Sequence, residues 1–189
     1  DVNAESGTPW VRYTYDSLRT PETTYEVNVD TGERKILKVQ EVKGYDPAKY
    51  VTERVWATAR DGTKVPVSLV HRKDFKRDGT AALFQYGYGS YGISSDPDFN
   101  SPFYGAATYI SMLDRGMVVA IAHVRGGQEL GRAWFDDGHL LNKKNSFTDF
   151  IDVTEGLVAQ GYAAKGRVAA MGGSAGGLLM GAVANMAPQ

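Results

Sequence analysis

The sequence contains no cysteine among its 189 residues, and its formal net charge is −1. The absence of cysteine excludes disulfides, a thiol nucleophile and a cysteine-based metal site, and it fits a reducing compartment. A nearly neutral chain offers no electrostatic case for a nucleic-acid partner or an anionic membrane surface. We therefore expect a cytoplasmic protein without nucleic-acid or membrane partners.

Targeting signals and long apolar runs are also missing. The first ten residues, DVNAESGTPW, have no basic start followed by an apolar core, so no signal peptide is visible. No apolar run approaches the roughly 20 residues that a membrane span needs. The length suits one good-sized domain, or one domain plus a piece of another.

The chain changes character near residue 45. Before that point, three short alternating runs predict strands at 11–17, 23–29 and 33–40, and Asp30-Thr31-Gly32 is a hairpin turn signal. Three strands are too few for a domain. We interpret residues 1–45 as the C-terminal remnant of a β-sheet module such as a propeller blade.

Residues 46–189 alternate between strands and helices, which predicts an α/β layer with a mixed, mostly parallel sheet. Pro66 predicts at least one unpaired or irregular position in its strand. Ser101 and Pro102 are typical of a helix start, and Asn145 or Ser146 could cap the later helix. The predicted strands are 53–59, 64–71, 80–87, 117–124 and 167–171, and the predicted helices are 101–116, 145–162 and the run from Leu178.

Ser174 lies between two pairs of glycines, at the junction of a strand ending at Met171 and the following helix. Gly172-x-Ser174-x-Gly176 matches the nucleophile elbow, a sharp turn that lifts a serine hydroxyl above a sheet. Small neighbours are needed because the strand and the helix pass closely. The turn also places the amide of Ala175 at a helix N-terminus, where an oxyanion would form.

A serine nucleophile needs a base, and in this fold the acid and the histidine follow the serine in the chain. Residues 175–189 contain no Asp, Glu or His. We expect His71 at an exposed strand edge, His123 as a hydrogen-bonded support and His139 in a solvated loop. The expected acid and base therefore lie beyond Gln189, in a missing C-terminal segment, and the chain alone is expected to be inactive.

The loop that follows the strand at 80–87 is the second candidate constellation. In an α/β-hydrolase this loop supplies an oxyanion donor, here from backbone amides or from the hydroxyls of Tyr86, Tyr88 or Tyr91. Asp96 and Asp98 by themselves are typical of an exposed acidic turn. Gly126-Gly127 lacks a complete dinucleotide or P-loop pattern, so we interpret that loop as shaped by pairing of Arg125 and Glu129 within the protein.

Four stretches together resemble the prolyl oligopeptidase family of serine peptidases, and within it the oligopeptidase B branch: YGYGSYG, HVRGGQELG, KKNSFTDF and GGSAGG. The resemblance implies an α/β-hydrolase domain capped by a β-propeller. We expect no cofactor and no metal. It implies cleavage of short peptides after Arg or Lys. Residues 1–45 would end the propeller, and residues 46–189 would begin the catalytic domain, truncated after the nucleophile helix.

The resemblance also implies roles for individual residues. Ser174 matches the nucleophile, the Ala175 amide one oxyanion donor and the Tyr88 hydroxyl the other. Asp96 and Asp98 match an acidic pair for basic side chains near the scissile bond, and Tyr91 an aromatic residue at the substrate subsites.

Two alternatives stay open. The elbow fixes acyl transfer and not the substrate, so a carboxylesterase or a peptidase of another specificity fits as well. Alternatively, the chain is a non-catalytic fragment or interaction module, since a sheet that ends after its nucleophile strand exposes an edge prone to self-association.

Overall fold

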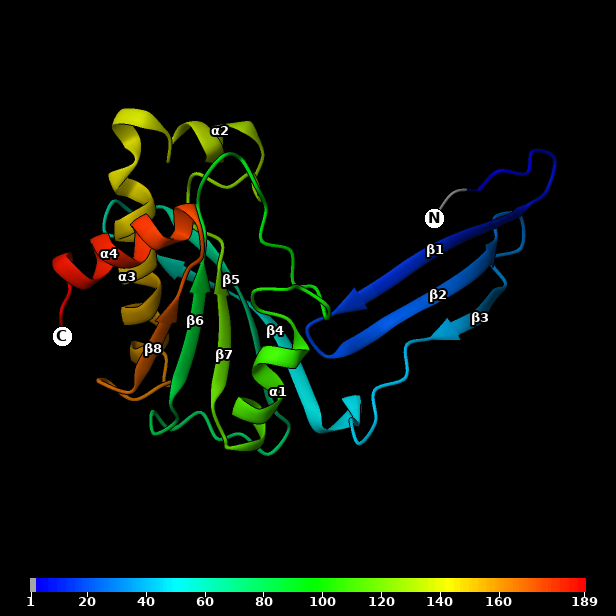
Figure 1. Cartoon of the computed structure of the whole chain (residues 1–189), viewed down its shortest axis with the longest axis horizontal. Helices are drawn as coiled ribbons and strands as arrows, with labels where there is room; N and C mark the ends of the chain where they lie inside the picture. The colour runs from blue at the N-terminus through cyan, green and yellow to red at the C-terminus, as the bar shows by residue number, and fades with distance from the viewer. Residues whose placement is uncertain (1–2) are drawn as a thin grey trace.

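The computed structural model describes residues 3–189, which form two separate sheets (Figure 1). The N-terminal sheet is antiparallel, with the order β1-β2-β3. Its strands are β1 (Trp10–Ser17), β2 (Thr20–Asn28) and β3 (Arg34–Val39). All three predicted strands are thus present, and Gly32 makes the predicted turn with a φ of 75°.

The second sheet has five strands in the order β4-β5-β7-β6-β8. The hairpin of β4 and β5 is antiparallel, whereas β6 runs parallel to both β7 and β8. This is the mixed sheet that the sequence predicts. The bounds are β4 (Tyr50–Thr58), β5 (Lys64–Arg72), β6 (Leu83–Gly87), β7 (Val118–Ala122) and β8 (Val168–Met171).

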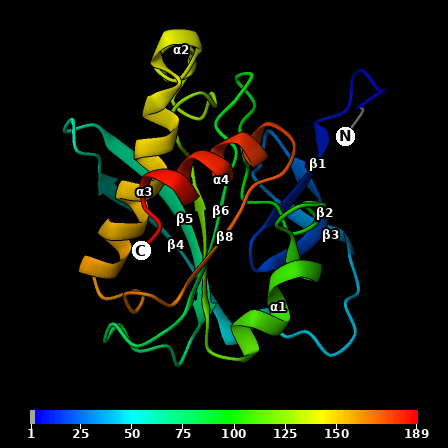
Figure 2. The same ribbon diagram turned by 60° about the vertical axis from the view of Figure 1, so that its left-hand side comes forward.

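Helices cover both faces of this sheet (Figure 2). Helices α3 (Lys144–Ala159) and α4 (Ala175–Met186) pack on one face, and α1 (Ala106–Asp114) packs on the other. Every residue of β6 and β7 is buried, as the apolar runs predict for central strands. The short helices are α2 (Arg132–Asp136), η1 (Pro47–Lys49) and η2 (Leu140–Asn142).

Helix α1 begins five residues later than its sequence pattern predicts. Residues 99–105 form a tight turn, closed by hydrogen bonds from Gly105 N to Ser101 O and from Ala106 N to Phe99 O at 2.8 and 2.7 Å. Tyr104 in this turn packs against Tyr86 of β6, with ring centroids 4.4 Å apart. The anchoring of this aromatic ring to the sheet overrides the Ser-Pro start signal.

The predicted caps of α3 are also wrong. The N-cap is Lys143, and no side chain makes a capping hydrogen bond there. The Ser146 hydroxyl instead donates to Arg125 O, and the Asn145 amide donates to Asp137 O. Both side chains tie the helix to the preceding loops.

Pro66 creates one unpaired position in β5, as predicted. Its carbonyl accepts a hydrogen bond from His123 N at 3.0 Å, but it has no N–H to return to His123 O. The indole of Trp134 donates to His123 O at 3.0 Å instead. The Trp134 side chain thus makes the hydrogen bond that a backbone N–H at position 66 would otherwise make.

Strands β6, β7 and β8 all point the same way, so their carboxyl ends lie at one edge of the sheet (Figure 1). Tyr88, His123 and Ser174 follow these ends in turn. Strand β8 pairs with β6 and is the last strand of the sheet, and its residues Ala169 and Ala170 are exposed. Along residues 3–189, no helix is long and apolar enough to cross a membrane.

Candidate active site

Ser174 occupies a strained turn between β8 and α4. Its φ of 54° and ψ of −122° lie in a region that non-glycine residues rarely adopt. A Cβ on Gly172 would lie 2.5 Å from the carbonyl oxygen of Gly176 and 3.0 Å from that of Gly87. The strand and the helix therefore pass each other as closely as the elbow requires.

The Ser174 hydroxyl and the Ala175 amide have no hydrogen-bonding partner among the described residues. Ser174 is exposed, and within the described part of the chain its side chain makes no hydrogen bond. Ala175 is the first residue of α4, so its amide has no partner within the helix and lies at the positive end of the helix dipole. This arrangement suits a developing oxyanion.

Tyr88 lies beside this turn because β6 and β8 are neighbours in the sheet. Its ring carbon Cδ2 lies 3.5 Å from the position that a Cβ on Gly176 would occupy, so the half-buried ring packs on the first turn of α4. Its hydroxyl makes no hydrogen bond to any other described residue. The structure thus brings Ser174, Ala175 and Tyr88 together, whereas Tyr86 is buried against Tyr104.

Tyr91 belongs to the tip of the same loop. It is 76% exposed and has a φ of 58°, in the left-handed region that a bulky residue seldom enters. A hydrogen bond from Gly92 N to Gly126 O at 3.0 Å supports this backbone. The loop therefore presents the Tyr91 ring to solvent on the side of the sheet where the strands end.

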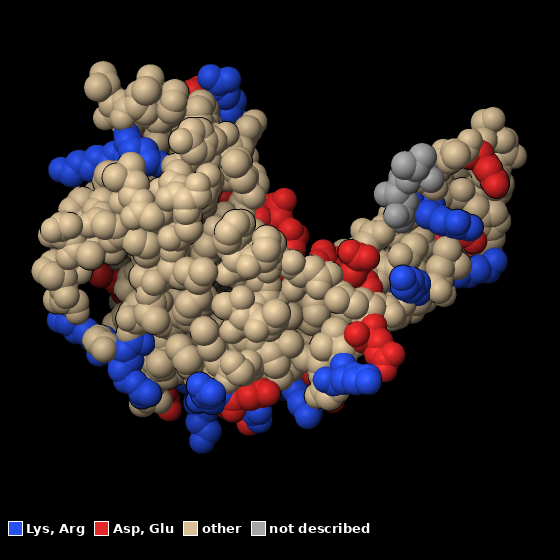
Figure 3. Space-filling model, viewed as in Figure 1, with Lys and Arg blue, Asp and Glu red and all other residues tan. Residues whose placement is uncertain are grey.

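Asp96 and Asp98 are exposed at the far end of this loop, next to the N-terminal sheet. Phe99 N donates to a carboxylate oxygen of Asp16 in β1 at 2.8 Å. The pKa of Asp98 is raised by partial burial and then by the negative charges of Asp16 and Asp96. Asp and Glu side chains gather in the notch between the two sheets (Figure 3). Among the described residues, no hydrogen bond or ion pair joins Asp96 or Asp98 to the serine turn.

The three histidines make no hydrogen bond to Ser174 within residues 3–189. The prediction of an exposed His71 is wrong, because His71 is buried and contacts Glu53 Oε1 and Arg72 O at 2.9 and 2.8 Å. His123 is a hydrogen-bonded support, as predicted, and His139 is exposed beside the Phe135 ring.

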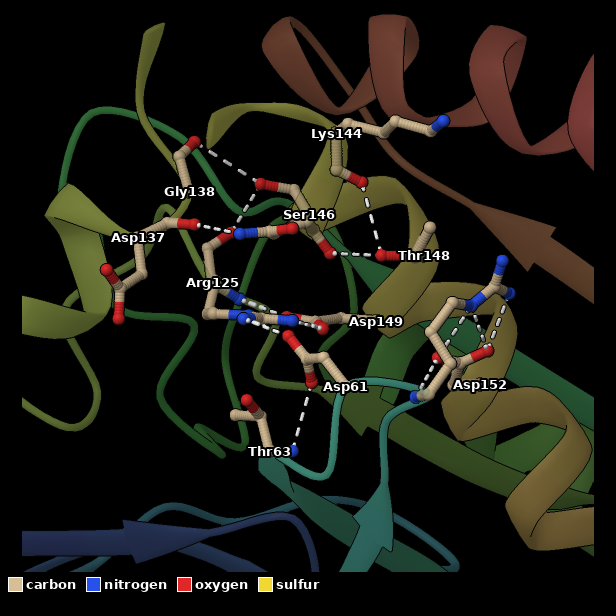
Figure 4. Close-up of polar contacts among 12 residues, drawn as sticks. Asp61, Thr63, Arg125, Asp137, Gly138, Lys144, Ser146, Thr148, Asp149 and Asp152 are labelled. Carbon is tan, nitrogen blue, oxygen red and sulfur yellow. Dashed lines mark hydrogen bonds and ion pairs between the residues drawn. The ribbon is translucent and has the colours of Figure 1, made fainter. Parts of the chain in front are cut away.

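Arg125, which is buried, is the centre of an ion cluster that joins the loop after β7 to α3 (Figure 4). Its guanidinium contacts Asp149 at 2.6 Å and Asp61 at 2.7 Å. Burial lowers the pKa of Arg125, but the hydrogen bonds and charges of these two carboxylates raise it by more. Arg125 and Glu129 both pair within the protein, as predicted, but not with each other. Arg125 pairs with Asp149 and Asp61, and Glu129 accepts a hydrogen bond from Ser95 N. This cluster fixes the loop after β7 to α3.

Phe103 is a site residue that the sequence did not reveal. It is 51% exposed, and its ring lies 3.7 Å from the position of a Cβ on Gly173, next to Ser174. The apolar pattern assigned Phe103 to a helix, so its place in the turn before α1 could not be read from spacing. In the described part of the chain, no group of three or more His, Asp or Glu side chains is arranged to hold a metal ion.

Comparison with known proteins identifies the family. Residues 104–189 match the profile described as the prolyl oligopeptidase family. Dipeptidyl aminopeptidase BI from Pseudoxanthomonas mexicana is 67% identical over the whole chain, and Protease 2 from Moraxella lacunata is 48% identical over 92% of it. The structure of oligopeptidase B from Leishmania major covers 97% of the chain with a TM-score of 0.85 and 46% identity. The chain belongs to the prolyl oligopeptidase family.

Family membership confirms the predicted fold class, a partial α/β-hydrolase sheet preceded by the last strands of a β-propeller. The chain spans about a quarter of these relatives, with 25% of dipeptidyl aminopeptidase BI and 25% of the Leishmania enzyme covered. The boundary between residues 45 and 46 stays a prediction. In the structure it falls in the segment between β3 and η1.

Proposed function

We propose that this chain supplies the nucleophile and both oxyanion donors of a serine peptidase that hydrolyses short peptides. The observation that carries the proposal is the strained Ser174 turn with the Tyr88 ring packed on the helix that begins at Ala175. An unpartnered hydroxyl, an unpartnered helix-terminal amide and a phenol hydroxyl then meet at one edge of the sheet. That combination suits acyl transfer.

In the proposed reaction, Ser174 Oγ attacks the carbonyl carbon of the scissile peptide bond while a general base takes its proton. The Ala175 amide and the Tyr88 hydroxyl donate hydrogen bonds to the oxyanion. The protonated base gives the proton to the leaving amine as the C–N bond breaks, and water then hydrolyses the acyl-enzyme ester. Among the described residues no histidine makes a hydrogen bond to Ser174, so we propose that the base and its acid come from outside these 189 residues. The chain alone would then be inactive.

For the substrate, we propose a peptide with a basic residue, cleaved after Arg or Lys. Support comes from the acidic end of the loop that follows β6, where partial burial and then the charges of Asp16 and Asp96 raise the pKa of Asp98, and a cation bound there would relieve the repulsion between these charges. Tyr91, exposed on the same loop, adds an aromatic surface for the peptide.

A second specificity follows from the relative that is 67% identical, which is named a dipeptidyl aminopeptidase. The free ammonium group of a peptide's N-terminus is also a cation that the three aspartates could bind. Arginyl substrates with free and with acetylated amino termini separate the two possibilities. Equal turnover of the two substrates supports recognition of the arginine side chain. Loss of turnover on acetylation supports recognition of the free N-terminal ammonium group.

The test of the catalytic proposal is labelling of the full-length protein with a fluorophosphonate, followed by mass mapping of the adduct. We expect one adduct, on Ser174, and no adduct after Ser174→Ala. Tyr88→Phe should lower kcat by about 10²–10³ while labelling stays detectable, since that is the usual effect of losing one oxyanion donor. An adduct elsewhere, or unchanged turnover by Tyr88→Phe, would refute the assigned roles.

A further inference from the structure

The loop of residues 88–99 is held at two points by charged side chains that the proposed reaction does not use. One is Lys143, at the N-terminus of α3, and the other is Glu129, in the loop after β7. Each contacts a different end of the loop. Tyr88 lies at the first end, and Asp96 and Asp98 lie at the second.

Lys143 holds the oxyanion end. Its ammonium group donates to the carbonyl of Gly89, the residue that follows Tyr88, and to Ser90 Oγ at 2.8 Å. It also contacts Ser146 Oγ at 3.2 Å. All these partners are neutral oxygens, and burial lowers the pKa of Lys143. A lysine placed this way loses hydration without gaining a carboxylate partner, which is unfavourable for stability alone.

Rigid structure lies behind this contact. Ser146 Oγ donates to Arg125 O and also approaches the carbonyls of Gly89 and Gly138 at 3.4 Å. Arg125 is fixed in turn by Asp149 (Figure 4). The carbonyl of Gly89 is therefore bound to the start of α3, which Asp149 of the same helix ties to Arg125.

Glu129 holds the acidic end. Its side chain is 7% exposed, and its Oε1 accepts a hydrogen bond from Ser95 N at 3.0 Å, one residue before Asp96. Its Oε2 is buried and makes no hydrogen bond within the described residues. A Cβ on Gly127 would lie 2.2 Å from Glu129 Oε2, so a larger residue at this position would displace the carboxylate.

His123 lies next to the Glu129 carboxylate without a hydrogen bond to it. His123 Nε2 lies 2.7 Å from Arg54 Nη1, which can only donate, so Nε2 must be an acceptor. The ring proton of the neutral histidine then belongs on Nδ1, which faces Glu129 Oε1 at 3.5 Å. Burial lowers the pKa of His123, which favours this neutral form.

We propose that Lys143 and Glu129 are positioning residues that fix the two ends of the loop independently, Lys143 for the Tyr88 hydroxyl and Glu129 for the Asp96–Asp98 pair. The proposal rests on the function proposed above. The two residues share no hydrogen-bonding partner, so their effects should add. They should also appear in different kinetic constants.

The experiment uses the full-length protein with arginyl and neutral peptide substrates. Lys143→Met should lower kcat by about 10-fold to 100-fold on every substrate, since small misplacements of catalytic groups cost up to about that much, with KM little changed. Lys143→Arg should recover part of the loss. Lys144→Met is the matched control, because Lys144 is exposed and points away from the cluster (Figure 4). It should retain full activity.

Glu129→Gln should raise KM for arginyl substrates by about tenfold, with kcat retained and neutral substrates unaffected. Thermal midpoints of all variants show whether each is folded. A loss in kcat alone from Glu129→Gln, or equal effects on neutral and arginyl substrates, would overturn its assigned role.

The double variant Tyr88→Phe/Lys143→Met separates the two proposals. If Lys143 acts through Tyr88, the double variant should be no slower than Tyr88→Phe. The role of Lys143 would be overturned, and the proposed function would stand, in either of two cases. In one, the loss in kcat of the double variant equals the product of the two single losses. In the other, Lys143→Met is unimpaired while Tyr88→Phe is impaired. An unimpaired Tyr88→Phe would instead overturn the proposed function.

Discussion

The ion cluster around Arg125 gives a stability prediction whose size follows from the structure. Asp149 is fully buried and accepts hydrogen bonds from Arg125 N, Nε and Nη2 at 3.0, 2.9 and 2.6 Å. Asp149→Asn would leave a guanidinium that is 6% exposed with Asp61, itself 43% exposed, as its remaining carboxylate among the described residues. Removing one partner of a buried ion pair costs about 3–5 kcal/mol. We expect the lower end, about 3 kcal/mol, because Asp61 still neutralises part of the charge.

Urea unfolding followed by tryptophan fluorescence is a suitable assay. Trp134 is buried in the same core and donates to His123 O, two residues before Arg125, so its emission reports on this region. With a urea slope of about 1–3 kcal/mol/M, the midpoint should fall by about 1–3 M.

Asp61→Asn is the matched control, because it removes a carboxylate from the same guanidinium at an exposed position. Its cost should be within about 1 kcal/mol, because Asp61 is itself 43% exposed and solvent screens its charge. An Asp149→Asn midpoint no lower than that of Asp61→Asn would refute the reasoning. So would a slope that changes while the midpoint does not, because that result means the unfolded or native ensemble has changed.

Three further predictions concern acid stability, the serine turn and the oxyanion tyrosine. The pKa of Asp61 is lowered to about 2, chiefly by the Thr63 amide and further by Arg125. Its stabilising contribution is therefore complete above its ordinary pKa and lost as pH falls towards 2. Acid titration of the unfolding midpoint should show this loss, and Asp61→Asn should lack it. Gly172→Ala should lower kcat/KM at least 100-fold, because its Cβ would lie 2.5 Å from a backbone oxygen, whereas Gly173→Ala meets its nearest neighbour at 3.7 Å and should retain most activity. Equal activity of these two variants would contradict the close-approach argument. Tyr88→Phe should lose about 10²–10³ in kcat on an arginyl substrate, and near-normal turnover would exclude its hydroxyl from the reaction.

The order of strands and helices was predictable because it depends on local signals. Alternating runs predicted the N-terminal sheet, and the continuous apolar run at 117–124 predicted β7 as a buried central strand. The strand–glycine–serine–glycine–helix order predicted the turn at Ser174. Each of these signals comes from residues close in the chain.

The failures have one physical cause, contacts between distant segments. The Ser-Pro signal at 101–102 predicted the wrong helix start, because the packing of Tyr104 on Tyr86 holds these residues in a turn. His71 lies at a strand end, yet Glu53 of the neighbouring strand and the Phe75 ring bury it. Lys143, one of two adjacent lysines, gave no sign in the sequence that its ammonium group reaches the backbone after Tyr88. The sequence alone does not distinguish Lys143, which is partly buried, from Lys144, which is exposed.

The serine turn itself shows how local and distant constraints combine. The sequence explains Gly172 and Gly176 as neighbours of a sharp turn, but both residues also face the carbonyl oxygen of Gly87, at the end of β6. A Cβ on either would lie 3.0 Å from that oxygen. The same closeness places Tyr88, the next residue, against the first turn of α4. The glycines around Ser174 therefore do more than permit its backbone angles. They set the distance between β8, which leads to Ser174, and β6, which leads to Tyr88, so a change at Gly172 should disturb both proposed catalytic groups at once.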